Sequence, residues 1–201
     1  MITIVDYGMG NLGSILNMFK RIGAKAMISS SHDEILNAGK LILPGVGAFD
    51  AAMTRIRDTG LSMILDKRAM VDRIPILGIC LGMQILTRGS EEGELPGLGW
   101  IPAQAKRFPV QPDLKVPHMG WNIAYPSNVS RLTENFEKET RFYFVHSYAV
   151  FVDKAENSIL KTEYGVEYDS AIQRDNIYGV QFHPEKSHRF GMQVLKNFVS
   201  L

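Results

Sequence analysis

Residues 75–84 read Pro-Ile-Leu-Gly-Ile-Cys-Leu-Gly-Met-Gln, and this stretch indicates the class of fold more clearly than any other. Residues 75–79 are apolar enough to form a strand buried on both faces, and the residues after Cys80 continue as a helix. Gly78 and Gly82 flank Cys80 where strand and helix would meet. The pattern Gly-x-Cys-x-Gly is the nucleophile-elbow arrangement, with cysteine in place of serine.

The segments before this stretch alternate between strand and helix patterns. Residues 2–5 and 40–43 are short apolar runs that end in glycine-containing turns. Apolar residues recur at helical spacing over residues 12–22, and two further helices are expected over about 48–57 and 61–71. Such alternation predicts an α/β fold, namely an open, mostly parallel sheet with helices on both faces.

The chain changes character after about Gly89, where short strand candidates follow one another closely. They cover residues 142–145, 149–152, 158–160, 171–172 and 178–181. Apolar residues at helical spacing from Phe190 to Phe198 predict a closing amphipathic helix. Because no repeat or linker interrupts the pattern, we expect one domain over residues 1–201.

The composition is that of an ordinary globular protein: of 201 residues, 45% are hydrophobic and 21% charged, with a formal net charge of +1. No basic block indicates a nucleic-acid binder. No apolar run reaches the roughly 18 residues of a membrane span, and the first residues lack the basic start of a signal peptide. We therefore expect a cytoplasmic protein that binds neither membranes nor nucleic acids.

Cys80 is the single cysteine of the sequence, which excludes a disulfide within the chain and a metal site built from several cysteines. A free cysteine is most often a small buried hydrophobe. At the start of a helix, however, unpaired N–H groups and the helix dipole favour the thiolate, which is the reactive form. The elbow pattern favours this second interpretation, in which Cys80 is a nucleophile.

His183, one of five histidines, is the candidate base for this nucleophile. It follows a strand expected over residues 177–182 and precedes Pro184, which disfavours helical angles at the residue before it. In an extended segment residues two apart point to the same side, so Glu185 can orient the imidazole. Nucleophile, base and orienting carboxylate are the parts of covalent hydrolysis. Both motifs fall at the carboxyl ends of expected parallel strands, where active sites gather.

Residues 44–47, Pro-Gly-Val-Gly, end another strand at the same edge. Their glycines permit unusual backbone angles, so the N–H of Val46 or Gly47 can face a developing oxyanion. The N–H of Leu81, directly after the nucleophile, is the natural second donor. An ordinary turn is the alternative interpretation of the loop, and the residues alone leave the two open.

These motifs resemble those of a known family. Residues 78–84 and 182–185 are similar to the nucleophile and His-Pro-Glu motifs of the class I glutamine amidotransferases. Within that family the chain most resembles the glutaminase subunits of imidazole glycerol phosphate synthases. Four segments carry this closer resemblance: Asp6–Asn11, Pro44–Gly47, Pro117–Asn122 and Tyr143–Tyr148. The resemblance implies the class I glutamine amidotransferase, flavodoxin-like fold over nearly the whole chain.

The resemblance also implies a reaction. Cys80 would attack the side-chain amide of L-glutamine while His183 moves the proton, so that ammonia and then glutamate leave. No cofactor or metal ion is implied. The positions that match the family's glutamine site are Gly47, Gln84, Glu92, Ser147 and Tyr148.

A partner is implied as well. In the family the glutaminase forms a heterodimer with a (β/α)8-barrel cyclase, which receives the ammonia and makes imidazole glycerol phosphate in histidine biosynthesis. Asn11, Trp121 and Lys186 match positions that meet this cyclase, and we expect all three on loops at the active-site edge. Trp121 could instead be a core tryptophan, because large aromatic residues usually contribute to a core.

Three other interpretations remain. Residues 97–100 and 185–191 look slightly more like paralogous subunits that supply ammonia to amidino-sugar enzymes of surface polysaccharide biosynthesis. A non-catalytic interaction subunit would keep the fold and the partner surface, but it would not need Cys80, His183 and Glu185 together. A redox-sensing cysteine protein would explain Cys80 but would leave Gln84 and the His-Pro-Glu motif without a role.

Overall fold

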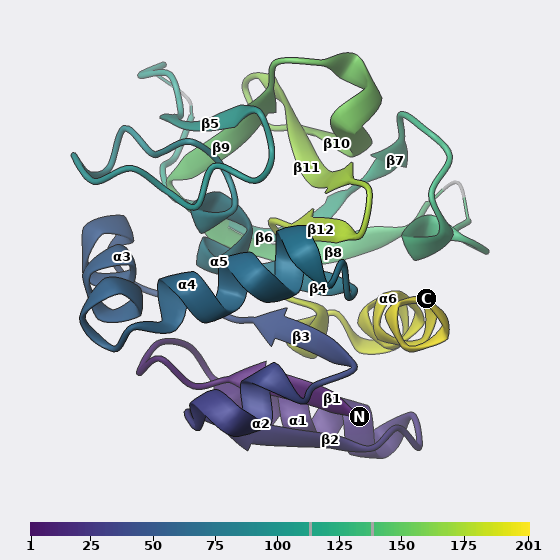
Figure 1. Ribbon diagram of the computed structural model, residues 1–201. Helices are drawn as coiled ribbons and strands as arrows, with labels where there is room; N and C mark the ends of the chain where they lie inside the picture. The colour runs from purple at the N-terminus through teal and green to yellow at the C-terminus, as the bar shows by residue number, and fades with distance from the viewer. Residues whose placement is uncertain (113, 138) are drawn as a thin grey trace.

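The computed structural model describes residues 1–112, 114–137 and 139–201, and its centre is a sheet of eight strands (Figure 1). Their order across the sheet is β2 (Ala26–Ser29), β1 (Ile2–Val5), β3 (Lys40–Leu43), β4 (Ile76–Ile79), β12 (Ile177–Val180), β11 (Glu167–Arg174), β10 (Ser158–Glu163) and β7 (Tyr125–Pro126). The pairings from β2 to β12 are parallel, and those from β12 to β7 are antiparallel. This confirms the open, mostly parallel sheet.

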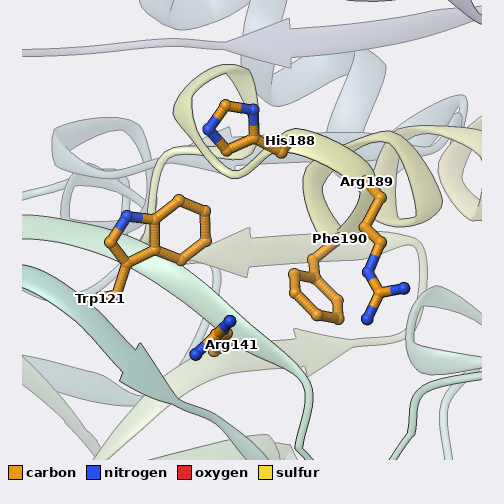
Figure 2. Close-up of a pocket in the computed structure, with 5 residues that line it drawn as sticks. All are labelled: Trp121, Arg141, His188, Arg189 and Phe190. Atoms are coloured by element: carbon orange, nitrogen blue, oxygen red, sulfur yellow. The ribbon is translucent and has the colours of Figure 1, made fainter.

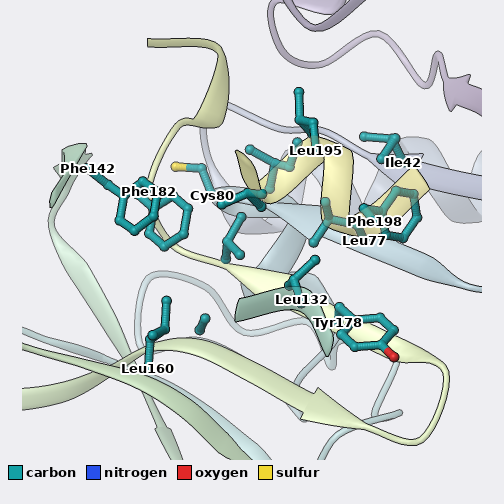
Figure 3. Packing of buried hydrophobic residues seen from close by; sticks show 14 of the residues in the cluster. Ile42, Leu77, Cys80, Leu132, Phe142, Leu160, Tyr178, Phe182, Leu195 and Phe198 are labelled. Atoms are coloured by element: carbon teal, nitrogen blue, oxygen red, sulfur yellow. The ribbon is translucent and has the colours of Figure 1, made fainter. Parts of the chain in front are cut away.

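Helices cover both faces of the parallel part. In chain order they are α1 (Leu12–Arg21), α2 (His32–Leu36), α3 (Phe49–Asp58), α4 (Leu61–Asp66), its π-helical extension η1 (Lys67–Val71), α5 (Leu81–Ile85) and α6 (His188–Ser200). Because side chains alternate along a strand, Leu77 packs in the apolar cluster of α1 and α6, whereas Ile76 packs in that of α2, α3 and α4. Figure 3 shows Leu77 and Ile42 beside Leu195 and Phe198 of α6.

The second half of the chain adds two separate two-stranded ribbons. One pairs β5 (Ala103–Arg107) with β9 (Tyr148–Val152), and the other pairs β6 (His118–Ile123) with β8 (Arg141–His146), both antiparallel. Single 3-10 turns form η2 (Arg131–Thr133), η3 (Ala155–Asn157) and η4 (Pro184–Lys186). In the described part of the chain no helix is both long and apolar enough to cross a membrane.

The sequence prediction differs from the structure in several elements. Strands β2, β5 and β6 were not predicted, because each carries polar or small residues on a partly exposed face and lacks a continuous apolar run. The helix after Cys80 spans only Leu81–Ile85. The strand before His183 ends at Val180, and residues 184–186 form a 3-10 turn where we expected extended backbone.

Candidate active site

Cys80 occupies a tight turn between β4 and α5. Its φ is +56°, its side chain is 6% exposed, and its backbone N–H donates to the carbonyl of Val180 at 2.8 Å. A Cβ at Gly82 would lie 1.8 Å from the carbonyl oxygen of Leu43, and one at Gly78 would lie 2.4 Å from that of Gly82. The elbow therefore requires both glycines, as the sequence predicted, and holds Cys80 in a left-handed conformation that non-glycine residues rarely adopt.

His183 and Glu185 lie at the end of the neighbouring strand β12. Nδ1 of His183 is 2.7 Å from Oε1 of Glu185, and both side chains are almost fully buried. The prediction that they lie together is confirmed, but its stated reason was wrong: His183 is extended, and η4 then turns Glu185 back toward the ring. The backbone N–H of His183 donates to the carbonyl of Tyr143, which fixes the turn to β8.

The carboxylate defines the hydrogen positions on the imidazole. A carboxylate only accepts hydrogen bonds, so Nδ1 carries the hydrogen and Nε2 is left free to exchange a proton. Nε2 is buried and has no hydrogen-bond partner among the described residues. Burial opposes charging of the ring, but the neighbouring Cys80 and Glu185 outweigh it and raise the pKa of His183 from 6.5 to about 10. The two neighbours therefore favour the protonated, imidazolium form of this ring.

The loop after β3 blocks one of the two expected oxyanion donors. The N–H of Leu81 donates to the carbonyl of Gly45 at 3.3 Å, so this donor is already engaged. Gly45 is closely packed, because a Cβ there would lie 2.9 Å from that of Leu81. Val46 and Gly47 are exposed, and Gly47 has a φ of +117°. A rotation of the peptide between Gly45 and Val46 would remove the carbonyl and present the N–H of Val46 in its place.

A pocket of about 280 Å³ opens beside Cys80. Its lining residues are Val46, Gly47, Cys80, Leu81, Gln84, Glu92, Pro117, Val145, His146, Ser147 and Tyr148. All five positions expected around glutamine are among them. Glu92 reaches this wall from a distant loop, where its carboxylate accepts the N–H of Phe49 at the start of α3 at 3.0 Å.

Two buried residues near Cys80 were not predicted. Gln181 is fully buried, and its side-chain nitrogen lies 3.8 Å from the sulfur. His146 lines the pocket, and its Nε2 lies 3.2 Å from the hydroxyl of Tyr168, which also meets Nδ1 of His118 at 3.1 Å. The signal for Gln181 was its place two residues before His183, in a segment that the sequence predicted to be extended, where residues two apart face the same side.

The expectation that Asn11, Trp121 and Lys186 all lie on loops is confirmed for Asn11 and wrong for the other two. Trp121 is on strand β6, Asn11 caps α1 by accepting the N–H of Ser14, and Lys186 ends η4. Trp121 is 44% exposed, which excludes the core alternative. The ring of Tyr143 joins two of them: it lies 6.3 Å from that of Trp121 and 5.6 Å from Nζ of Lys186.

A hollow of about 410 Å³ adjoins Trp121 (Figure 2). The ring of Trp121 stacks on that of His188, with centroids 5.6 Å apart and planes 6° apart. Arg141, Arg189 and Phe190 complete the lining. The hollow is therefore lined mainly by the apolar parts of these side chains, and it lies outside the pocket that contains Cys80.

The model of the family "Glutamine amidotransferase class-I" matches residues 3–201.

The chain belongs to the class-I glutamine amidotransferase family.

Several proteins in this family resemble the chain over its full length. It is 52% identical to "Imidazole glycerol phosphate synthase subunit HisH 2" of Methanococcus maripaludis, with 99% of this chain and 98% of the relative covered. It is 51% identical to the protein of the same name from Pseudomonas aeruginosa, with both chains covered completely. The subunit HisH of Bdellovibrio bacteriovorus is 47% identical, with 98% of each chain covered.

Several solved structures share the fold. A crystal structure of a glutamine amidotransferase gives a TM-score of 0.76 at 16% identity and covers 100% of this chain and 98% of its own. A structure of PurLQS from Thermotoga maritima gives a TM-score of 0.72 at 16% identity, and the match covers 99% of this chain and 97% of that one. At such identities the likeness concerns the fold, and it confirms the expected amidotransferase architecture.

Proposed function

We propose that the chain is the glutaminase subunit of an imidazole glycerol phosphate synthase, with Cys80, His183 and Glu185 as its catalytic residues. The observation that carries this proposal is the meeting of an elbow cysteine and a buried His–Glu pair at the ends of adjacent parallel strands, β4 and β12. The names of the full-length relatives support the same function.

In the proposed reaction, the sulfur of Cys80 forms a bond to the side-chain amide carbon of L-glutamine. The His183 imidazolium gives its Nε2 proton to the leaving nitrogen, the C–N bond breaks, and ammonia departs. A γ-glutamyl thioester remains on Cys80. Water then attacks this carbon, His183 takes the proton, and the C–S bond breaks to release glutamate. Glu185 keeps the imidazole in one orientation throughout.

The glutamine site is proposed to use polar groups that remain free in the pocket. The amide nitrogen of Gln84 donates to the carbonyl of Tyr148 at 3.1 Å and to Oε1 of Gln181 at 3.2 Å. Both of its N–H groups are thus used, so Oε1 of Gln84 is the group left to accept a hydrogen bond from the substrate. Gly47, Glu92, Ser147 and Tyr148 complete the proposed substrate contacts along the same wall.

The oxyanion hole, formed by N–H groups of Val46 or Gly47 and Leu81, is proposed to be closed in the chain alone. The N–H of Leu81 already donates to the carbonyl of Gly45 and is therefore not available to an oxyanion. Loss of one oxyanion donor costs roughly 10²–10³ in rate, so this conformation would make isolated glutaminase activity low. Rotation of the Gly45–Val46 peptide on partner binding would supply the missing donor and so couple hydrolysis to the demand for ammonia.

The proposed partner is a (β/α)8-barrel cyclase that binds at Asn11, Trp121 and Lys186 in a heterodimer. The relatives' names describe them as subunits of a synthase. On β6 the side chains of Met119, Trp121 and Ile123 alternate outward and are 62%, 44% and 44% exposed. Exposed apolar residues gathered in this way favour a protein interface. The interface borders the active-site edge, so ammonia would have a short path to the cyclase.

A second candidate is an ammonia-supplying subunit for an amidino-sugar enzyme of surface polysaccharide biosynthesis. It is favoured by residues 97–100 and 185–191, which look slightly more like this paralogous group. Both candidates share the glutaminase chemistry and a cyclase-like partner. Assaying the complex with each acceptor distinguishes them. A purely non-catalytic subunit is disfavoured, because the buried His183–Glu185 pair has no use in a binding protein.

The test is glutamine hydrolysis by the wild-type chain and by Cys80→Ala, each alone and with the cyclase. We expect low activity from the wild-type chain alone, strong activation by the cyclase, and no activity from Cys80→Ala. Added ammonium should restore the cyclase reaction in the Cys80→Ala complex, because only the ammonia supply is lost. Glutamine turnover by Cys80→Ala would refute the proposal.

A further inference from the structure

Gln181 connects the pocket wall to the sulfur of Cys80. It directly follows β12, it is 0% exposed, and its backbone N–H already donates to the carbonyl of Ser170 at 2.9 Å. The pairing with the neighbouring strand thus uses the backbone of Gln181 and not its side chain. A buried amide is costly unless its polar atoms are paired, so the contacts of this side chain call for a separate explanation.

The neighbouring hydrogen bonds determine which end of the Gln181 amide faces the sulfur. The carbonyl of Tyr148 can only accept, so the group of Gln84 that lies 3.1 Å from it must be the –NH₂. The same –NH₂ lies 3.2 Å from the Gln181 amide, and the atom it meets there must be the acceptor, Oε1. The remaining end of Gln181, its –NH₂, is thereby directed at Sγ of Cys80, 3.8 Å away.

We propose that Gln181 is a positioning residue that stabilises the Cys80 thiolate by donating a hydrogen bond to its sulfur. The inference rests on the proposed function, in which Cys80 is the nucleophile. Hydrogen bonds to a charged acceptor are about twice as strong as those between neutral groups, so the donor favours the thiolate over the thiol. Because the chain Tyr148–Gln84–Gln181 fixes the donor, the sulfur is also held in one direction beside the pocket.

This arrangement gives Gln84 a part in the chemistry besides substrate binding. The bond from Gln84 keeps the carbonyl of Gln181 turned away from the sulfur, where a lone pair would repel the thiolate. Cys80 and Glu185 favour a positive charge on His183, near the sulfur. Gln181, two residues earlier in the chain, supplies a neutral donor. The two contributions are separable, because the Gln181 amide does not titrate.

The test is the rate at which iodoacetamide alkylates Cys80, measured from pH 5 to pH 10. Cys80 is the single cysteine of the sequence, so the reaction reports on this sulfur alone, and it needs neither glutamine nor a partner. Only the thiolate reacts. In Gln181→Met, which keeps the bulk and removes the donor, we expect the rate on the acidic limb of the pH profile to fall about tenfold. At pH 10 the rate should return to that of the wild-type chain.

Gln173→Met is the matched control. Gln173 lies on the adjacent strand β11, and its side chain bonds Ser130 and Asp175 rather than the active site. We expect its alkylation profile to equal that of the wild type. An unchanged profile in Gln181→Met would overturn the proposal, and so would an equal loss of rate at every pH, because that indicates altered access to the sulfur.

A second variant is available if Gln181→Met does not fold. Gln181→Glu has the same shape and keeps the acceptor for Gln84, but it places a carboxylate oxygen by the sulfur. At pH 8 we expect alkylation at least tenfold slower than in the wild type, and equal rates would overturn the proposal. The proposed function has its own outcome: a wild-type complex that alkylates as expected but does not hydrolyse glutamine refutes the glutaminase assignment and leaves the role of Gln181 standing.

Discussion

The carboxyl edge of the parallel strands and the β6–β8 ribbon beside it use histidine in opposite ways. At the edge, His183 is buried next to Cys80 and Glu185, which raise its pKa to about 10. In the ribbon, burial lowers the pKa of His118 to about 4 and that of His146 to about 3. At the edge the neighbouring groups thus favour a charged histidine. In the ribbon the buried histidines stay neutral, and apolar side chains face outward. The histidines are buried in both regions, so burial does not explain the opposite pKa shifts, whereas the neighbouring charges do.

The largest effect is expected at the edge. His183→Asn removes the proposed proton carrier and should lower kcat for glutamine hydrolysis in the complex by about 10³–10⁴. Glu185→Gln keeps the shape and loses the orienting charge, so its loss should be smaller by about tenfold or more. Steady-state kinetics on folded variants measure both. A greater loss in Glu185→Gln would show that the roles are assigned wrongly.

The backbone of the edge can be tested against a matched glycine. Gly82→Ala forces a Cβ against the Leu43 carbonyl and should lower the free energy of unfolding by about 3 kcal/mol. Gly13, on the exposed face of α1, has nothing within 4 Å of an added Cβ. Gly13→Ala should therefore stabilise the protein by up to about 1 kcal/mol. Urea unfolding measures both, and equal effects would contradict the close packing at the elbow.

The outer face of the ribbon should matter for association and not for folding. Trp121→Ala should weaken binding of the cyclase by about 2 kcal/mol, because it removes a large exposed aromatic anchor. Lys186→Ala should instead mainly reduce the activation of hydrolysis by the cyclase, since Lys186 ends the turn that carries Glu185. Calorimetric titration followed by glutaminase assays separates the two effects. A Trp121→Ala chain that is unstable alone yet binds normally would place Trp121 in a structural role.

The smallest effect per residue concerns the neutral histidines. Their pKa values in the folded protein lie below the ordinary 6.5, so the unfolded state binds more protons as the pH falls. Their contribution to stability is present above pH 6.5 and is lost as the pH falls toward 4. Between pH 7 and pH 5 each should account for about 1–2 kcal/mol of lost stability. The double variant His118→Gln/His146→Gln should show a shallower decline in urea unfolding, and an unchanged slope would contradict the argument.

The difference between the two regions also decided what the sequence could reveal. The parallel strands are continuous apolar runs ending in glycine turns, so β1, β3, β4 and the elbow at Cys80 were predictable from local patterns. The ribbon is half exposed, and its strand β6 mixes histidine, glycine and asparagine with apolar residues, so periodicity gave no signal there. Contacts between residues far apart in the sequence were not predicted, and the reason there was different.

Gln181, Gln84 and Tyr148 illustrate that second limit. Their hydrogen bonds join positions that are far apart in the sequence, and no spacing rule connects them. The proximity of His183 and Glu185 was predicted because the two are nearly adjacent. Even so, the backbone takes a 3-10 turn that Pro184 permits at its first position. Local patterns thus located Cys80, His183 and Glu185, while the orientation of their side chains depended on tertiary contacts.

In the proposed reaction Cys80 carries the acyl group of glutamine. The direct measurement is mass spectrometry of the intact chain and of its peptides after the complex with the cyclase is mixed with L-glutamine and quenched in acid. We predict a γ-glutamyl adduct on the peptide that contains Cys80, lost on treatment with hydroxylamine and absent in Cys80→Ala. Release of glutamate at full rate with no such adduct in a quench on the timescale of a single turnover would contradict it.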